Sequence, residues 1–85
     1  MDRSRGREIA IGFTLGRPAA VTVKVFSRAG RLMREVTSDA PMSSGANLVR
    51  WDGRDRDGAI VDDGLYLVTV EALGQKQVQA LAIVR

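Results

Sequence analysis

The sequence contains no cysteine and no histidine. The missing cysteines exclude disulfides, thiolate metal sites and cysteine nucleophiles, and the missing histidines remove the commonest general base and the commonest metal ligand. An enzyme built from this chain would depend on carboxylates, lysine or tyrosine. No stretch approaches the ~18 apolar residues of a membrane span. The charged start at residues 1–7 is not followed by the apolar run of a secretory signal, so we expect neither feature.

The chain is short. With 85 residues it is expected to form one domain, because two would leave neither half with a workable hydrophobic core. Its hydrophobic fraction is 45% and its charged fraction 27%, which are ordinary values for a globular chain and argue against global disorder. We expect residues 1–7 to form a flexible N-terminal segment and residues 8–85 to form the folded domain.

Positive charge is in mild excess, with a formal net charge of +3. The basic residues are scattered along the chain, and of the few aromatic residues only Phe26 is a candidate for an exposed ring that could stack on a base. Both observations argue against nucleic-acid binding. Lys24, Arg34 and Arg50 are expected on one exposed sheet face, where they either protect sheet edges or attract an acidic partner or polysaccharide.

Apolar residues recur at every second position in five segments. This alternation is typical of strands with one face in a core and one toward water, and the residue types also favour strands. The apolar faces of the first four segments are formed by Ile9, Ile11, Phe13, Leu15, Val21, Val23, Val25, Val49, Trp51, Tyr66, Val68 and Val70. The fifth segment, 78–84, has Ala80 and Ala82 on one face and Leu81 and Ile83 on the other.

Turn-forming residues separate these segments. Glycine, proline and aspartate occur at residues 16–18, 29–30, 41–45, 52–53, 57–58, 62–64 and 74–75. Residues 28–36 have weak helical spacing, but the segment is short and contains Gly30, so we interpret it as a hairpin turn followed by a strand. Short strands with a turn about every 8–12 residues are typical of an all-β sandwich. We predict an immunoglobulin-like or fibronectin-III-like antiparallel β-sandwich of about seven strands.

Four motifs follow one another in the order of a known family. They are residues 13–26 (FTLGRPAAVTVKVF), 29–33 (AGRLM), 44–58 (SGANLVRWDGRDRDG) and 63–70 (DGLYLVTV). The pattern resembles the Ig-like domain of the flagellar hook-capping protein, the FlgD-type Ig-like domain, and covers residues 9–85. The run from tryptophan to tyrosine is its specific part. Gly16 stands where the family usually has proline, and Phe26-Ser27 replaces its usual Tyr-Asp.

The resemblance implies a non-catalytic module of an extracellular or cell-surface bacterial protein. Similar domains are appended to the C-termini of secreted bacterial proteins, need no cofactor, and contact a protein partner or their own parent polypeptide. Two alternatives stay open. One is a carbohydrate- or surface-binding module of a secreted hydrolase, and the other is a C-terminal export or sorting domain.

Six residues of the specific run are expected to have structural roles. They are Trp51, Asp52, Gly53, Gly58, Gly64 and Tyr66. Trp51 is expected to fill the core, burying on the order of 200 Å²; an exposed indole that stacks on sugars is the alternative. The Asp52 carboxylate is expected to accept backbone N–H bonds in an Asx turn, and the three glycines to adopt positive φ. Tyr66 is expected to bury its ring and bond a backbone carbonyl, as a tyrosine corner does.

The loop after the tryptophan is acidic. Its charged residues are Asp52, Asp55, Asp57, Asp62 and Asp63, offset only by Arg54 and Arg56. The spacing Asp55-x-Asp57-Gly58 matches part of an EF-hand calcium loop, but glycines occupy that loop's first and last ligand positions. Weak Ca²⁺ binding is one interpretation, and Asx turns with solvated charge are the other. Without an apolar pocket the same carboxylates make a poor glycosidase pair. We therefore predict no catalytic residue and no metal ligand.

The last predicted strand indicates how such a domain makes contacts. Both faces of residues 77–84 carry apolar side chains, so one face is left for a partner or a second copy of the domain. The free N–H and C=O groups of an edge strand can also pair with another chain. We therefore expect protein–protein contact through sheet edges and faces, including self-association.

Overall fold

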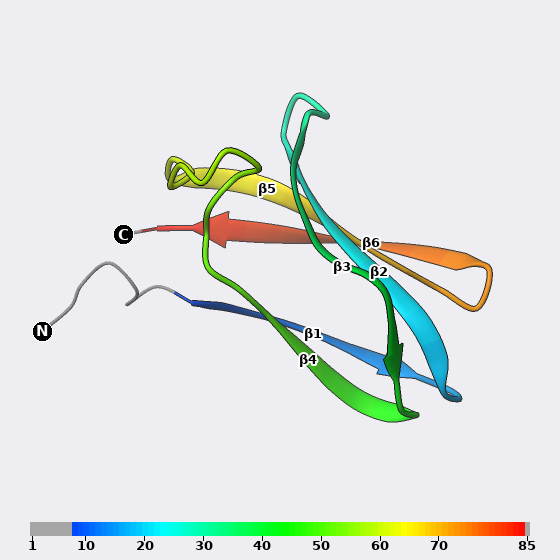
Figure 1. The fold of residues 1–85 in the computed structure, drawn as a ribbon. Coiled ribbons are helices and arrows are strands. Elements are labelled where there is room, and N and C mark those ends of the chain that lie inside the picture. The colour runs from blue at the N-terminus through cyan, green and yellow to red at the C-terminus, as the bar shows by residue number, and fades with distance from the viewer. Residues whose placement is uncertain (1–7, 85) are drawn as a thin grey trace, which may run out of the picture.

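The chain folds into six β-strands in two layers, and no helix occurs in residues 8–84, the part that this computed structural model describes. The strands are β1 (Ile9–Leu15), β2 (Ala19–Ser27), β3 (Leu32–Met42), β4 (Gly45–Trp51), β5 (Gly64–Ala72) and β6 (Gln75–Ile83). One layer is the two-stranded sheet β1-β4, and the other is the four-stranded sheet β3-β2-β5-β6 (Figure 1). Every pairing is antiparallel.

The prediction of an all-β antiparallel sandwich is therefore confirmed, with six strands in the described residues where about seven were expected. The segment 1–7, which was expected to be flexible, lies outside the described residues. No helix in residues 8–84 has the length and apolar character needed to cross a membrane.

The core lies between the two sheets and is built by alternation. In β1 the burial follows the period of two without exception after the first residue, so that Ile11, Phe13 and Leu15 are buried and the residues between them are exposed. The remaining buried apolar side chains are Val21, Val23, Val25, Val49, Trp51, Val61, Tyr66, Val68, Val70 and Ile83. Each such side chain contributes roughly 1.5–3 kcal/mol when it leaves water. Val61 is the member that alternation did not indicate, because it lies in a loop.

The predicted turn at residues 28–30 is present, and a strand follows it as expected. The Gly30 N–H donates to the Ser27 carbonyl at 2.9 Å, and Gly30 has a φ of 90°. The expected loop at residues 41–45 is shorter than predicted, because Pro41 and Met42 belong to β3. Pro41 pairs with Ala20 in a strand at the edge of the sheet. Proline is tolerated in such a strand because the missing N–H is not needed by a second neighbour.

The expectation that three basic residues share one exposed face is wrong. Lys24 alternates with buried Val23 and Val25 and so lies on the outer face of the four-stranded sheet. Arg50 lies on the outer face of the other sheet, where its Nη1 is 3.8 Å from Glu8 Oε1. Arg34 pairs with Val25 after the register of β2 and β3 has shifted, and its side chain points toward the loop that follows β4.

One buried hydroxyl on the four-stranded sheet has no hydrogen-bond partner in residues 8–84. Thr69 lies on the outer face of β5, between Lys24 of β2 and Val78 of β6, and is only 7% exposed. Its Oγ1 is the atom left unpaired. A buried polar group without a partner has lost its hydration and gained nothing in return.

Replacing Thr69 with valine is therefore expected to stabilise the protein, because it exchanges the hydroxyl for a methyl group of similar shape. We expect T69V to raise the free energy of unfolding by about 1 kcal/mol in urea denaturation. Thr22→Val is the matched control on β2. The Thr22 Oγ1 accepts the Asp39 N–H at 3.1 Å, so that change should give no gain. A T69V protein that unfolds at lower urea than the wild type would contradict the assignment.

Candidate functional site

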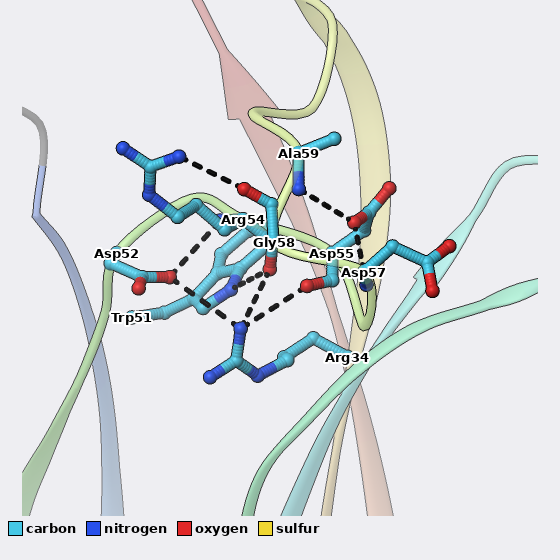
Figure 2. A network of polar contacts seen from close by, with 8 residues as sticks. All are labelled: Arg34, Trp51, Asp52, Arg54, Asp55, Asp57, Gly58 and Ala59. Atoms are coloured by element: carbon cyan, nitrogen blue, oxygen red, sulfur yellow. Dashed lines mark hydrogen bonds and ion pairs between the residues drawn. The ribbon is translucent and has the colours of Figure 1, made fainter. Parts of the chain in front are cut away.

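The residues singled out in the sequence meet where the chain crosses from β4 to β5. Figure 2 shows this region, with Trp51 at the end of β4 and the loop after it folded back beside Arg34. The crossing carries the chain from the two-stranded sheet to the four-stranded sheet. The contacts of this crossing therefore join the two layers at this end of the sandwich.

The loop begins as a small hairpin. Arg54 and Ile60 form an isolated antiparallel bridge, the Asp55 N–H donates to the Ala59 carbonyl at 2.8 Å, and the Gly58 N–H donates to the Asp55 carbonyl at 3.0 Å. Gly58 has a φ of 87°, a conformation that other residues rarely adopt. The glycine at this turn is therefore required by the backbone, as the sequence predicted.

Two aspartate carboxylates hold the loop from within. Asp52 Oδ1 accepts the Arg54 N–H at 3.0 Å, which is the predicted Asx turn. Asp55 Oδ1 accepts the N–H groups of Asp57 at 2.9 Å and Ala59 at 3.0 Å (Figure 2). Bonds from backbone N–H groups to a carboxylate are charge-assisted and stronger than neutral ones. These two carboxylates therefore act as turn-forming groups.

Trp51 anchors the loop to the core. Its side chain is 2% exposed, which fits the core position that the alternation indicated and leaves no ring free to stack on a sugar. The indole Nε1–H donates to the Arg54 carbonyl at 3.0 Å. The ring also meets Tyr66 edge-on, with centroids 6.5 Å apart and planes at 71°, an arrangement that aromatic pairs favour.

Tyr66 fixes the far end of the crossing. Its hydroxyl donates to the Asp62 carbonyl at 2.7 Å, and its ring is 7% exposed. A tyrosine that bonds back to the backbone just before its own strand is the arrangement of a tyrosine corner. Gly64 lies between the two partners with a φ of 149°, and Gly53, at the other end of the crossing, has a φ of 76°. Both glycines therefore have the positive φ that the sequence predicted.

Arg34 also holds the loop, a role that its expected position on an exposed sheet face did not predict. Its Nη1 donates to the carbonyls of Arg54 at 3.3 Å and Asp55 at 3.2 Å, and it lies 3.9 Å from Asp52 Oδ1. The Arg54 carbonyl thus accepts from both Trp51 and Arg34 (Figure 2). A half-buried guanidinium with several donors suits this clustering of oxygen acceptors. No local pattern in the sequence indicates the contact, because β3 and the loop are 20 residues apart.

The polar contacts described in this loop support its backbone. No three acidic side chains in residues 8–84 lie close enough together to hold a metal ion. The calcium interpretation of residues 52–63 therefore gains no support. One hollow beside the loop, about 250 Å³ in volume, is lined by Arg31, Leu32, Met33, Asp55, Arg56 and Asp57. That lining is too polar to desolvate a carboxylate for acid catalysis.

Removing the Tyr66 hydroxyl should loosen the crossing without emptying the core. Tyr66→Phe keeps the ring against Trp51 but leaves the Asp62 carbonyl without this donor. We expect the free energy of unfolding to fall by about 1–2 kcal/mol in urea denaturation. The tryptophan fluorescence of the folded variant should keep its wild-type wavelength, because the indole stays buried. An unchanged stability would contradict the assigned role of the hydroxyl.

Truncating Arg34 should have a comparable effect through different contacts. Arg34→Met keeps much of the aliphatic stem and removes the donors to the two loop carbonyls, so we expect a loss of about 1–2 kcal/mol in the same measurement. Arg31→Met makes the same chemical change at an exposed position of the preceding turn and should alter stability by less than about 0.5 kcal/mol. Equal effects of the two substitutions would show that only net charge matters.

Comparisons with known proteins agree with this geometry. The family model described as the FlgD Ig-like domain matches residues 2–76. The crystal structure of FlgD from P. aeruginosa superposes with a TM-score of 0.68 at 20% sequence identity, covering 87% of this chain and 60% of that chain. No curated protein sequence matches the chain. Since the family model covers most of the sequence, including the run from Trp51 to Tyr66, the chain belongs to the FlgD Ig-like domain family.

Proposed function

We propose that this domain is a non-catalytic assembly module, which contacts a protein partner or the remainder of its own parent polypeptide. The observation that carries the proposal is the outer face of β5 and β6, where apolar side chains are exposed. Val78 is 58% exposed and Leu65 is 44% exposed. Carboxylates are the groups of this loop that could act in acid–base catalysis, but those of Asp52 and Asp55 accept backbone N–H bonds of the loop.

The register of the two strands explains why this face is apolar. Leu65 lies opposite Ala82, Leu67 opposite Ala80, and Thr69 opposite Val78. Because Leu81 and Ile83 point to the other side of β6, toward the core, the outward positions are not needed for the domain's own packing. Contiguous apolar surface of this kind on a small domain is typical of an interaction site.

Membership of the FlgD Ig-like family supports the assembly role and its setting. The family takes its name from the flagellar hook-capping protein, so we propose a related scaffold role in an extracellular or cell-surface bacterial protein. This chain covers 60% of the P. aeruginosa FlgD chain. The remaining activities of such proteins are therefore not carried over to this domain.

The carbohydrate-binding alternative lacks the side chains it needs. Sugar binding at a protein surface generally relies on exposed aromatic rings, and this sequence has four aromatic residues. Phe13, Trp51 and Tyr66 are buried, and Phe26 is half-buried in the four-stranded sheet. We therefore favour protein contact, and nothing in the geometry selects the export or sorting alternative.

The proposed partner contact through the outer face of β6 can be tested by introducing one charged residue there. Val78→Lys in the full parent polypeptide is expected to reduce co-purification of its partner, or of the separately expressed remainder of the parent, by about tenfold or more, since it buries a charge in the contact. Ala46→Lys, on an exposed position of β4, is the control and should co-purify normally. Circular dichroism should show both variants folded. Wild-type co-purification by V78K would remove this face from the proposal.

A further inference from the structure

The two sheets have neighbouring free edges on one side of the sandwich. Within residues 8–84, β1 pairs only with β4, and β6 pairs only with β5. The two edges lie one above the other, because Gln79 Nε2 of β6 donates to the Gly12 carbonyl of β1 at 3.0 Å. A single side chain thus spans the gap between the layers, which in a sandwich is about 10 Å.

This bond also fixes which backbone groups of β1 face outward. The Gly12 carbonyl accepts from β6, so it points away from β4. In an antiparallel strand the N–H and C=O of one residue point to the same side, and successive residues alternate. Ala10, Gly12 and Thr14 therefore present their N–H and C=O groups along the free edge.

Neither edge carries the usual protection against pairing. Natural edge strands are blunted by charged residues, proline or bulges. Residues 9–15 contain no charged residue and no proline, and residues 75–83 contain one charge, Lys76. The pairings of β1 and of β6 with their own neighbours run without a register shift, so both strands are regular enough to accept another strand.

We propose that a second copy of this chain pairs along both edges about one two-fold axis, which passes by Gly12 and Gln79. This proposal rests on the assembly function proposed above and names one partner for it. In β1, Gly12 would lie opposite Gly12 of the second copy, and Ala10 opposite its Thr14. In β6, Gln79 would lie opposite Gln79. Because an axis normal to two stacked sheets relates the strands of both layers, one symmetry operation extends both sheets.

The charges flanking β1 favour this register. Glu8 precedes β1 and would lie opposite Gly16 of the second copy, next to its Arg17, and the two-fold axis repeats this pair of opposite charges. Glu8 and Arg17 are exposed. Glu8 lies 3.8 Å from Arg50 of its own chain, but this ion pair is exposed and weak, so Glu8 can exchange it for Arg17 of the second copy. In β6, Lys76 would lie opposite Ala82 and meet no like charge. Opposite charges across paired strands are favourable, and like charges directly opposite are not.

The surface around the axis also fits a second strand. Gly12 has no side chain to obstruct it, and the neighbouring Leu48 is 57% exposed. A Cβ placed on Gly12 would lie 3.8 Å from Leu48 Cδ1, so this leucine flanks the glycine on the outer face. A strand added beside Gly12 would cover part of that apolar side chain. The Gly12 carbonyl has a second lone pair, so it can accept from the new strand while Gln79 remains bonded.

Charge placed at Gly12 tests the pairing. A side chain fits there, since Gly12 lacks a positive φ and a Cβ at this position would meet its neighbours at ordinary contact distances. We expect the wild-type chain to dimerise reversibly in sedimentation equilibrium between about 10 µM and 1 mM. Gly12→Lys and Gly12→Glu should each weaken the dimer by about tenfold or more through like charges across the axis. An equimolar mixture of G12K and G12E should dimerise again. Ala20→Lys, on an exposed position of β2, should dimerise as the wild type does.

A wild-type chain that stays monomeric over this range would overturn the proposal. So would a dimer that G12K leaves intact, which would place the contact elsewhere. A monomer that dimerises after deletion of residues 1–7 would show that the chain's own preceding residues occupy the edge, and would equally overturn it. The sedimentation experiments measure self-association, whereas the V78K experiment measures co-purification with a partner or with the remainder of the parent. The failures of the two proposals are therefore distinguishable.

Discussion

A buried tryptophan requires a partner for its indole N–H, and the organisation of this domain depends on how Trp51 meets that requirement. The partner is the carbonyl of Arg54, which lies three residues later in the chain. The backbone must therefore turn sharply as it leaves β4, and the carboxylates of Asp52 and Asp55 stabilise that turn. The burial of Trp51 in the core and the path of the exposed loop therefore depend on each other, because the same hydrogen bond serves both.

The same contact joins the two layers. Trp51 ends a strand of the two-stranded sheet, whereas Arg34 and Tyr66 belong to the four-stranded sheet. Arg34 bonds the loop carbonyls, and Tyr66 packs against the indole while bonding the loop's other end. In a domain of this size the apolar core is thin. Polar bonds at one end of the sandwich therefore supplement apolar burial in fixing how the sheets are placed.

The sequence predicted those features that depend on residues close together in the chain. Alternation identified the buried faces of β1, β2 and β5, and the aspartate–glycine pairs identified the turns, since each depends on residues within a few positions. Arg34 was misplaced because the shifted register of β2 and β3 changes which side chains share a face, and period-two counting assumes that no such shift occurs. Pro41 was assigned to a loop because its compatibility with a strand depends on β3 being an edge, which is a property of the whole sheet.

The connectivity of the smaller sheet has a consequence for how the domain folds. β2 pairs with β3, and β5 pairs with β6, across short turns. β1 instead pairs with β4, which brings Ile9 beside Trp51 from a distant part of the chain. Closing that long loop costs chain entropy before any contact compensates for it. The local hairpins β2-β3 and β5-β6 are therefore expected to form before the sandwich closes. The β2-β5 and β1-β4 pairings both join distant segments of the chain, and the site where Trp51 of β4 meets Tyr66 of β5 is complete only when both have formed.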